Sequence, residues 1–469
     1  MLTILYAPGL GAWFQQDDFA WLYMSRWMPA DASLFYRLFS AQAQGTVRPL
    51  GDRLPFLLLM QLFGRNAFVF HAFAFAAQLV NAVLVTAIGM RLLSSPGQGA
   101  VVALLWSASA SLVAPMVWAS ALNQTIFAFF LLSAFLCRLL YEETGRRKFL
   151  ALEWTAFVLG FGAQEWNVVY PALVLAWMAL SDRWAWKQVA MQFSFAGAYS
   201  VIHVLFVPST TGPYTIRLSM DSLHVLWRYW STALGPEELA RRFGSELFLG
   251  AYSWVALLTA LAVLSAVKCK SRTSVRVALF GLLWFVAAIS PVLLIPNQVQ
   301  GYYLFVPSIG IAILCGAAVS SAFAPSSGKL AKALAVLALS VFAGANLRTA
   351  VSERDWTIQR TLRVKHFYDS LAEARRTSVA PCLLLSGMSD DAFWAGYYGV
   401  RRYVPDLEDT YLAPGASRTI TPALTIFGTP ADYEMPEAEA RASLASGHCS
   451  GFDVARNQRI APQTNPAQR

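Results

Sequence analysis

The sequence predicts an all-α membrane protein that crosses the bilayer about eleven times and ends in a small α+β region. Three observations carry this prediction. The chain of 469 residues is 57% hydrophobic and only 13% charged, its apolar runs reach the length of a membrane span, and its basic residues fall in alternate loops. A soluble domain usually has about a quarter charged residues. We therefore expect residues 1–349 to form a transmembrane domain and residues 350–469 a soluble region.

Apolar runs that approach the roughly 20 residues needed to cross a bilayer define the predicted spans. These runs are 67–90, 99–120, 122–141, 149–164, 166–181, 188–207, 247–267, 276–295, 303–323 and 330–349. The pair 149–164 and 166–181 is short and meets at Glu165, which predicts a helical hairpin. The run 2–14 is also short. We expect a tilted first span there, with a signal peptide as the alternative.

The positions of the basic residues predict the orientation of the chain. They cluster in alternate short loops: Arg91; Arg138, Arg146, Arg147 and Lys148; Arg183 and Lys187; Lys268, Lys270, Arg272 and Arg276; Lys329 and Lys332. The loops between these clusters, around Asn123, Gln164 and Asn297, contain no Lys or Arg. By the positive-inside rule the basic loops face the cytoplasm. The net charge of +9 therefore reflects topology, and no nucleic-acid partner is expected.

Two long loops, 15–66 and 208–246, are predicted on the outer side of the membrane. In the first, aromatic and polar residues alternate at Phe19–Tyr23 and at Leu34–Phe39. This pattern is typical of amphipathic helices that lie in the membrane interface. Leu54–Phe63 has only ten apolar residues, so we expect an interfacial or re-entrant piece rather than a span.

The composition changes near residue 350, where a charged, helix-like stretch extends to about Ser378. Strand-like runs follow at Cys382–Leu385, Tyr398–Val404 and Leu424–Phe427. With a cytoplasmic N-terminus and eleven spans, this region lies outside the cytoplasm. Cys382 and Cys449 are then in an oxidising compartment, where they either form a disulfide or remain two free thiols.

Adjacent carboxylates at Asp17 and Asp18 are the strongest candidates for a catalytic site. Ionised groups at the edge of a bilayer are costly unless they are solvated or functional, and two neighbouring carboxylates raise one pKa of the pair. The alternative is the start of a solvated helix, because Asp is favoured in first turns. Arg48 and Arg53 follow before the next span, and guanidinium groups bind phosphate oxygens bidentately.

This arrangement resembles the GT-C membrane glycosyltransferases, most closely the protein O-mannosyltransferase-type group. The resemblance covers about residues 1–350 and consists of Asp17-Asp18, Arg48-Pro49-Leu50, Gln164-Glu165 and the segment Tyr302–Gly310. Where the family has Lys and Arg, this chain has Gln164 and Tyr302. Both departures remove a positive charge, so other residues are expected to bind the donor phosphate: Arg48, Arg53, Arg217 or Arg228.

The resemblance implies an inverting glycosyltransferase that moves a sugar from a polyprenyl-phosphate carrier to an acceptor hydroxyl. Asp17 is expected to act as the general base, and Asp18 to orient the acceptor or hold a divalent cation. Glu165, Tyr302 and Tyr303 are expected to contact substrates. The implied partners are the lipid-linked sugar, an acceptor lipid, glycan or protein, and membrane lipids, in a bacterial inner (plasma) membrane. Apart from that cation, no cofactor is expected.

Two other classes of function remain open. A transporter or flippase of lipid-linked glycans would also need many spans, although such proteins often contain internal repeats, which we do not find between the two halves of this sequence. A non-catalytic protein of cell-envelope assembly is favoured by the two lost charges, at Gln164 and Tyr302.

Overall fold

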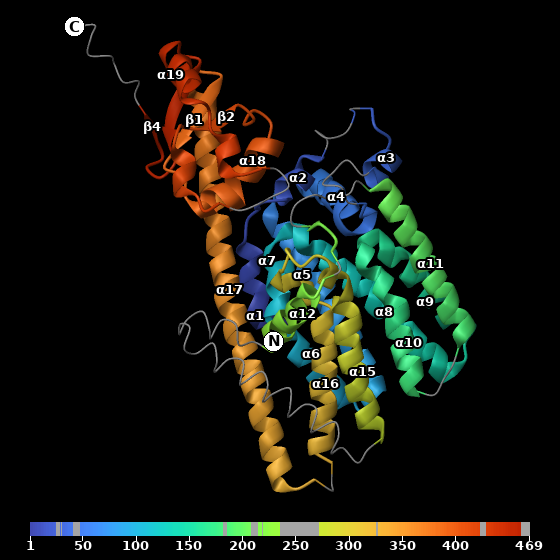
Figure 1. The fold of residues 1–469 in the computed structure, drawn as a ribbon. Coiled ribbons are helices and arrows are strands. Elements are labelled where there is room, and N and C mark those ends of the chain that lie inside the picture. The colour runs from blue at the N-terminus through green and yellow to red at the C-terminus, as the bar shows by residue number, and fades with distance from the viewer. Residues whose placement is uncertain are drawn as a thin grey trace, which may run out of the picture.

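The computed structural model describes residues 1–24, 29, 31–40, 47–181, 185–207, 214–217, 219–234, 272–324, 327–422 and 428–460. Within these residues the chain forms a helical body and a smaller unit with a sheet, which the long helix α17 joins (Figure 1). We call the described residues from 350 onward the C-terminal unit. The predicted class, a helical membrane-type body followed by a small α+β region, is confirmed at this level.

The body consists mainly of apolar helices. They are α5 (Ala67–Leu93), α6 (Pro96–Ser107), α7 (Val113–Val117), α8 (Leu122–Thr144), α9 (Arg147–Ala163), α10 (Tyr170–Ser181), α11 (Trp186–Phe206), α15 (Arg272–Ile289) and α16 (Pro307–Ala322). Five helical segments of the described chain are long and apolar enough to cross a membrane, or six if the pair around α6 and α7, bent by 64°, is one span. The eleven predicted spans stay a prediction, and the run 247–267 lies outside the described residues.

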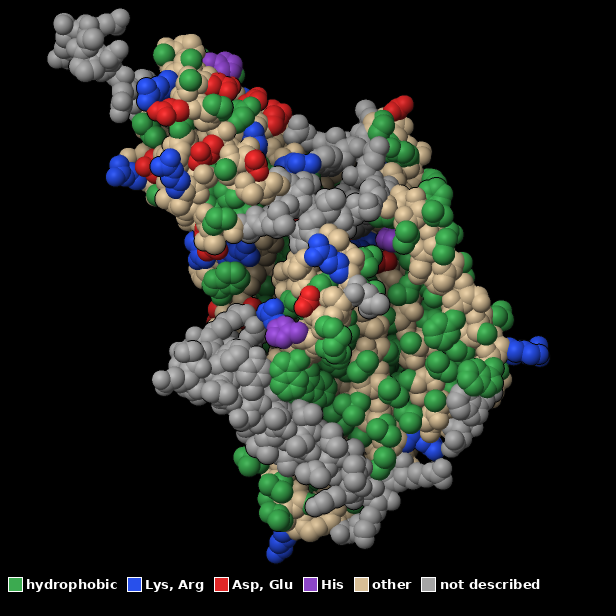
Figure 2. All heavy atoms as spheres, in the orientation of Figure 1, with side chains coloured by type: hydrophobic (Ala, Val, Ile, Leu, Met, Phe, Trp, Pro, Cys, Tyr) green, Lys and Arg blue, Asp and Glu red, His purple; other side chains and the backbone are tan. Residues whose placement is uncertain are grey.

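Charged and apolar side chains lie on different parts of the molecular surface. Figure 2 shows Lys, Arg, Asp and Glu side chains gathered on the C-terminal unit, whereas the visible face of the body carries mostly hydrophobic and uncharged side chains. On α11, for example, Val201, Val204 and Phe206 are exposed. Exposed apolar side chains over long helices are expected where lipid, and not water, surrounds the protein.

Glycine contacts let neighbouring helices of the body pack backbone to backbone. A Cβ on Gly281 of α15 would lie 2.6 Å from the carbonyl oxygen of Gly310 in α16. Similarly, a Cβ on Gly99 of α6 would lie 2.5 Å from the carbonyl oxygen of Thr86 in α5. Small residues are enriched at such interfaces because association in lipid depends on close van der Waals packing.

Arg138 occupies a different environment from the cytoplasmic loop that the charge pattern predicted. It lies within α8, where its side chain is 1% exposed, and its Nη2 is 2.9 Å from Oε1 of Glu153 in α9. Tyr170 of α10 and Gln192 of α11 donate to the same oxygen, each at 2.8 Å. The prediction for Arg138 was wrong because Glu153 makes a buried guanidinium tolerable. The network connects four helices.

α17 (Lys329–Thr377) has 49 residues and combines the predicted span 330–349 with the charged stretch that follows it. No Pro occurs in it, and its last Gly is Gly344. At 1.5 Å per residue the helix is about 74 Å long, more than twice the roughly 30 Å of a hydrocarbon core. If its first part spans a bilayer, its second part lies outside, in the C-terminal unit.

A four-stranded sheet, in the order β2-β1-β3-β4, organises the C-terminal unit. Its strands are β1 (Cys382–Ser386), β2 (Thr410–Leu412), β3 (Cys449–Asp453) and β4 (Gln458–Ile460), and its short helices are η10 (Ala392–Tyr397), α18 (Tyr398–Tyr403), η11 (Ala416–Thr419), η12 (Pro430–Tyr433) and α19 (Glu437–Ala445). β1 runs parallel to β2 and to β3, and β4 is antiparallel to β3. Cys382 and Cys449 are opposite each other in this register and form a disulfide.

Only the first of the three strand predictions in the C-terminal region is confirmed, by β1. The prediction of a strand at Tyr398–Val404 was wrong, because this segment forms α18. Buried side chains recur every three or four residues there, which is the period of a helix: Phe393, Tyr397, Val400 and Val404. The run Leu424–Phe427 lies outside the described residues.

The N-terminal region contains short helices. They are α1 (Leu2–Tyr6), η1 (Ala7–Gly11), α2 (Asp18–Leu22), α3 (Leu34–Phe39), η3 (Pro49–Arg53) and α4 (Leu54–Phe63). α3 exposes Leu34, Phe35 and Phe39, so its interfacial position stays a prediction. The interfacial interpretation of Phe19–Tyr23 was wrong, because every residue of α2 is buried. The physical reason is that the C-terminal unit covers α2 and shares one hydrophobic core with it.

In the second long loop, the structure describes α12 (Asp221–Ala233). The remaining short helical turns are η4 (Ala110–Leu112), η5 (Ala119–Ala121), η6 (Glu165–Val169), η8 (Ser290–Leu294) and η9 (Gly301–Leu304). Of these turns, η5, η6 and η9 contribute side chains to the cluster described next.

Candidate active site

Asp18 is fully buried and fixes α2 to the body. Its Oδ1 accepts hydrogen bonds from the backbone N–H and the hydroxyl of Ser120, at 2.6 Å and 2.5 Å, and its Oδ2 accepts one from the backbone N–H of Gln15 at 2.9 Å. Burial raises the pKa of Asp18 to about 7, although the hydrogen bonds from Ser120 and Gln15 lower it. Its oxygens are therefore engaged by the protein, and Asp18 joins α2 to η5.

Asp17, the preceding residue, differs from Asp18 in both exposure and bonding. It is partly exposed, and its carboxylate accepts no hydrogen bond from the part of the chain that the structure describes. Burial raises the pKa of Asp17 to about 6, although the positive charge of Arg48 lowers it. Of the two acids, Asp17 is the one free to exchange a proton with a bound molecule.

Arg48 forms a bidentate ion pair with Glu165. Its Nε donates to Oε2 at 2.8 Å and its Nη2 to Oε1 at 2.6 Å, and the two side chains are 17% and 26% exposed. Burial alone would raise the pKa of Glu165, but Arg48 outweighs it and lowers this pKa to about 2. Both groups are therefore charged at neutral pH.

A close approach of two backbones makes this ion pair possible. Arg48 directly precedes η3, and Glu165 opens η6 at the tip of the α9–α10 hairpin. A Cβ on Gly51 would lie 2.1 Å from the carbonyl oxygen of Ala163. No other residue type fits at position 51 without moving η3 away from the hairpin, because glycine alone has no Cβ.

Asp52 is a member of the cluster that the sequence did not single out as a site residue. It is buried, and its Oδ2 is 3.5 Å from Nη1 of Arg48, one helical turn away. Burial raises the pKa of Asp52 to about 7, although Arg48 lowers it. The spacing of four residues from Arg48 was the signal that could have identified it.

Aromatic side chains form another part of the cluster. The rings of Trp118 and Tyr302 are 5.8 Å apart, and those of Trp166 and Tyr303 are 4.6 Å apart. Burial raises the pKa of Tyr302 above its ordinary value, and so does the nearby charge of Asp17. Tyr302 is thus a neutral hydroxyl near the free carboxylate, as its predicted role in substrate contact requires.

Of the remaining predicted arginines, Arg53 meets the cluster through the electrostatic interaction of its guanidinium with Asp52, whereas Arg217 and Arg228 are not placed in it. Arg53 is buried and donates from Nη1 to the carbonyl oxygens of Arg37 and Leu38, at 3.2 Å and 3.0 Å, at the end of α3. Arg217 and Arg228 are exposed. Their predicted contacts with a donor phosphate stay predictions, and Arg48 is the guanidinium that the structure brings close to Asp17.

No protein-family model and no curated protein matches this chain.

A cation site finds little support in the described residues. Nowhere in them do three His, Cys, Asp or Glu side chains gather in a way that could hold a metal ion. The oxygens of Asp18, the expected ligand, already accept hydrogen bonds from Ser120 and Gln15. The residues present do not fit a divalent cation at Asp18.

Proposed function

We propose that this protein is an integral-membrane glycosyltransferase that moves a sugar from a polyprenyl-phosphate carrier to an acceptor hydroxyl. The observation that carries the proposal is the state of Asp17. This carboxylate is partly exposed, accepts no hydrogen bond from the described residues and lies near Arg48 in a body of apolar helices. A general base needs a free carboxylate, and a lipid-linked donor needs an apolar surface.

The reaction begins with proton transfer to Asp17. With a pKa near 6, Asp17 is about nine-tenths ionised at pH 7 and can accept the proton of the acceptor hydroxyl. The acceptor oxygen attacks the anomeric carbon and forms the new glycosidic bond, while the bond from that carbon to the phosphate oxygen breaks. The products are the inverted glycoside and free polyprenyl phosphate.

Arg48 is the proposed contact for the departing phosphate. Its Nε and Nη2 are used by Glu165, whereas its Nη1 has only the longer contact of 3.5 Å to Asp52. The N–H groups of Nη1 are therefore available to a phosphate oxygen, and Glu165 fixes their direction. A positioned guanidinium stabilises negative charge that develops on a leaving group.

The proposed topology is a GT-C-like fold of about eleven spans in a bacterial inner membrane, with the C-terminal unit outside the cytoplasm. Two features support that side for the unit. The disulfide between Cys382 and Cys449 is of a kind that persists in oxidising compartments. The charged second part of α17 suits water rather than lipid.

One observation favours the alternative of a non-catalytic assembly protein. Three carboxylates, those of Asp17, Asp52 and Glu165, interact electrostatically with the guanidinium of Arg48. Such a cluster repels an additional phosphate unless one or more of the carboxylates is protonated. The raised pKa of Asp52 reduces this repulsion, and for that reason we favour the transferase.

The test uses purified protein in nanodiscs with a panel of polyprenyl-phosphate sugars and short-chain acceptors. A transferase releases free polyprenyl phosphate, and Asp17→Asn should abolish the release. Release that is unchanged in Asp17→Asn would exclude Asp17 as the base. No release with any donor, together with translocation of a labelled donor in proteoliposomes, would instead indicate a flippase.

A further inference from the structure

We propose that the C-terminal unit positions Asp17, by holding the backbone of Gln16 between Ala395 and Gly399. This inference rests on the proposed function, because it assigns a positioning role toward the base of that reaction. The sequence of the C-terminal unit did not predict this positioning role. The residues that hold Gln16 are about 380 positions away in the chain, in helices that do not belong to the membrane body.

Gln16 has a backbone conformation that it would not keep without support. Its φ is +47°, in the left-handed region, which non-glycine residues rarely occupy. Its backbone N–H donates to the carbonyl oxygen of Ala395 in η10 at 2.8 Å. This bond from the C-terminal unit is made at the residue immediately before Asp17, so it sets the direction in which the chain enters Asp17.

The carbonyl group of Gln16, which belongs to the next peptide unit, is held by a steric contact. A Cβ on Gly399 of α18 would lie 2.5 Å from the carbonyl oxygen of Gln16 and 2.9 Å from Cδ2 of Phe19. The glycine thus lets α18 lie directly against residues 16–19, and Figure 1 shows α18 beside α2. Neither backbone group of Gln16 can move without moving η10 or α18.

α17 contacts residues before and after Gln16 in the chain. The backbone N–H of Trp13 donates to Oγ1 of Thr361 at 3.0 Å, and the ring of Tyr368 stacks on Phe19 with centroids 6.2 Å apart. The acid-bearing segment is therefore fixed on both sides of Gln16 by one helix of the C-terminal unit. Its position depends on how the unit sits on α17.

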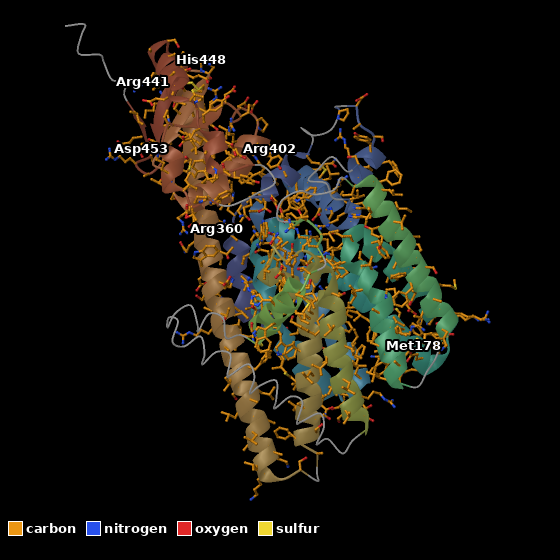
Figure 3. All side chains as sticks on the ribbon, in the orientation of Figure 1. Met178, Arg360, Arg402, Arg441, His448 and Asp453 are labelled. Atoms are coloured by element: carbon orange, nitrogen blue, oxygen red, sulfur yellow. A yellow bond between two sulfur atoms is a disulfide. The ribbon has the colours of Figure 1, made fainter. Side chains whose placement is uncertain are left out.

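An ion-pair cluster fixes η10 to α17. Asp391, just before η10, accepts from Nη2 of Arg363 at 2.5 Å, and its other oxygen is 3.6 Å from Nε of Arg360. Figure 3 labels Arg360 where α17 enters the C-terminal unit. Ala395 follows Asp391 by four residues, so this cluster determines where the acceptor oxygen for Gln16 lies.

The first test compares two glycine substitutions in full-length protein in nanodiscs. Gly399→Ala should displace Gln16, whereas Gly396→Ala places its Cβ 3.0 Å from Phe367 and does not face Gln16. We expect Gly399→Ala to lower kcat at least tenfold with KM within twofold, and Gly396→Ala to change kcat less than threefold. Equal losses in the two variants would show general destabilisation and overturn the proposal.

A second readout separates positioning from stability, namely the acidic limb of the pH–rate profile. Among the described residues, the titratable and charged groups that interact electrostatically with Asp17 are Asp18, Arg48, Tyr214 and Tyr302. If Gly399→Ala moves Asp17 toward water, the limb should shift to lower pH, because burial is what raises this pKa. An unchanged limb in a variant with reduced kcat would contradict the proposal.

A pair of substitutions at Gln16 tests the same backbone without changing the C-terminal unit. Gln16→Gly keeps the N–H donor and tolerates positive φ, so kcat should stay within twofold. Gln16→Pro removes the donor and fixes φ near −65°, so kcat should fall as in Gly399→Ala. Equal activity of the two variants would refute the proposal.

Asp17→Asn in the same assay separates the two hypotheses. If Asp17→Asn retains turnover, the proposed base is wrong. If Asp17→Asn is inactive but Gly399→Ala and Gln16→Pro are both fully active, the function stands and the positioning role fails. Hydrogen exchange of the peptide covering residues 13–22 gives a readout that needs no substrate, and it should become faster in Gly399→Ala but not in Gly396→Ala.

Discussion

Arg48 and Glu165 are 117 positions apart in the chain, and their side chains meet in a bidentate ion pair with contacts of 2.8 Å and 2.6 Å. This pair joins the first long loop, at the residue before η3, to the tip of the α9–α10 hairpin. Because Glu165 uses Nε and Nη2, the N–H groups of Nη1 are left for another anion.

Arg48→Lys should lower turnover at least about tenfold, because a lysine is a point charge and cannot contact Glu165 and a phosphate in a fixed fork. Release of polyprenyl phosphate by purified protein measures the effect. Arg376→Lys is the matched control, since Arg376 is 76% exposed on α17 and pairs only at the surface with Glu373. A similar loss in both variants would argue against a special role for Arg48.

Asp17→Asn and Asp18→Asn should separate activity from stability. Asp17→Asn abolishes turnover but leaves the midpoint of thermal unfolding within a few degrees, since no described hydrogen bond is lost. Asp18→Asn places an amide against the N–H donors of Gln15 or Ser120, with an expected cost of about 1–3 kcal/mol. Thermal unfolding in detergent measures both, and a destabilised Asp17→Asn with a stable Asp18→Asn would reverse the two roles.

The buried Asp52 should make the protein more stable in mild acid than at neutral pH. Its pKa is raised from 3.8 to about 7 in the folded protein, so the folded state binds more protons than the unfolded state between these values. Stability therefore falls as the pH rises from about 4 to 7, by up to about 4 kcal/mol. Asp52→Asn should reduce this slope in unfolding midpoints measured from pH 4.5 to 8, while the part due to Asp18, whose pKa is also raised to about 7, remains. An unaltered slope would show that Asp52 titrates normally.

Loss of the Cys382–Cys449 disulfide should destabilise the C-terminal unit. The bond connects residues separated by 67 positions, and the chain-entropy model gives about 4 kcal/mol for a loop of that length. Cys382→Ser should become sensitive to protease within residues 378–460, in the same way as wild-type protein treated with reductant. Cys315→Ala is the control, since Cys315 lies in α16 and is a free thiol. Equal protease resistance of Cys382→Ser and wild type would contradict this expectation.

The helices of the body could be predicted because a long apolar run has few alternatives to a helix in lipid. The exceptions have particular causes. Arg138 was placed in a loop because it belongs to the alternating clusters of basic residues, but Glu153 of α9 pairs with it inside the body, and Gln192 of α11 donates to the same carboxylate. The segment Tyr398–Tyr403 has strand-forming residues, but its burial pattern follows the helical period.

The candidate site could be predicted in its residue types but not in its partners. Asp17, Arg48 and Glu165 were identified by their position at one side of the membrane. The contacts that distinguish Asp17 from Asp18 come from Ser120 and Gln15, and those that hold Gln16 come from beyond residue 390. Apart from the bond from Gln15, three residues before Asp18, these contacts come from residues distant in the chain, about which a local sequence pattern carries no information.

The unbroken course of α17 also sets a rotational phase between the lipid-embedded part of the molecule and its outer part. An α-helix turns about 100° per residue, so insertion of one residue near Gly344 would swing Thr361, Tyr368 and the attached sheet to another side of the axis. Insertion of seven residues restores the direction to within about 20° but raises the outer part by about 10 Å. The number of residues in this helix is therefore as constrained as the identity of the acids whose segment it contacts through Thr361 and Tyr368.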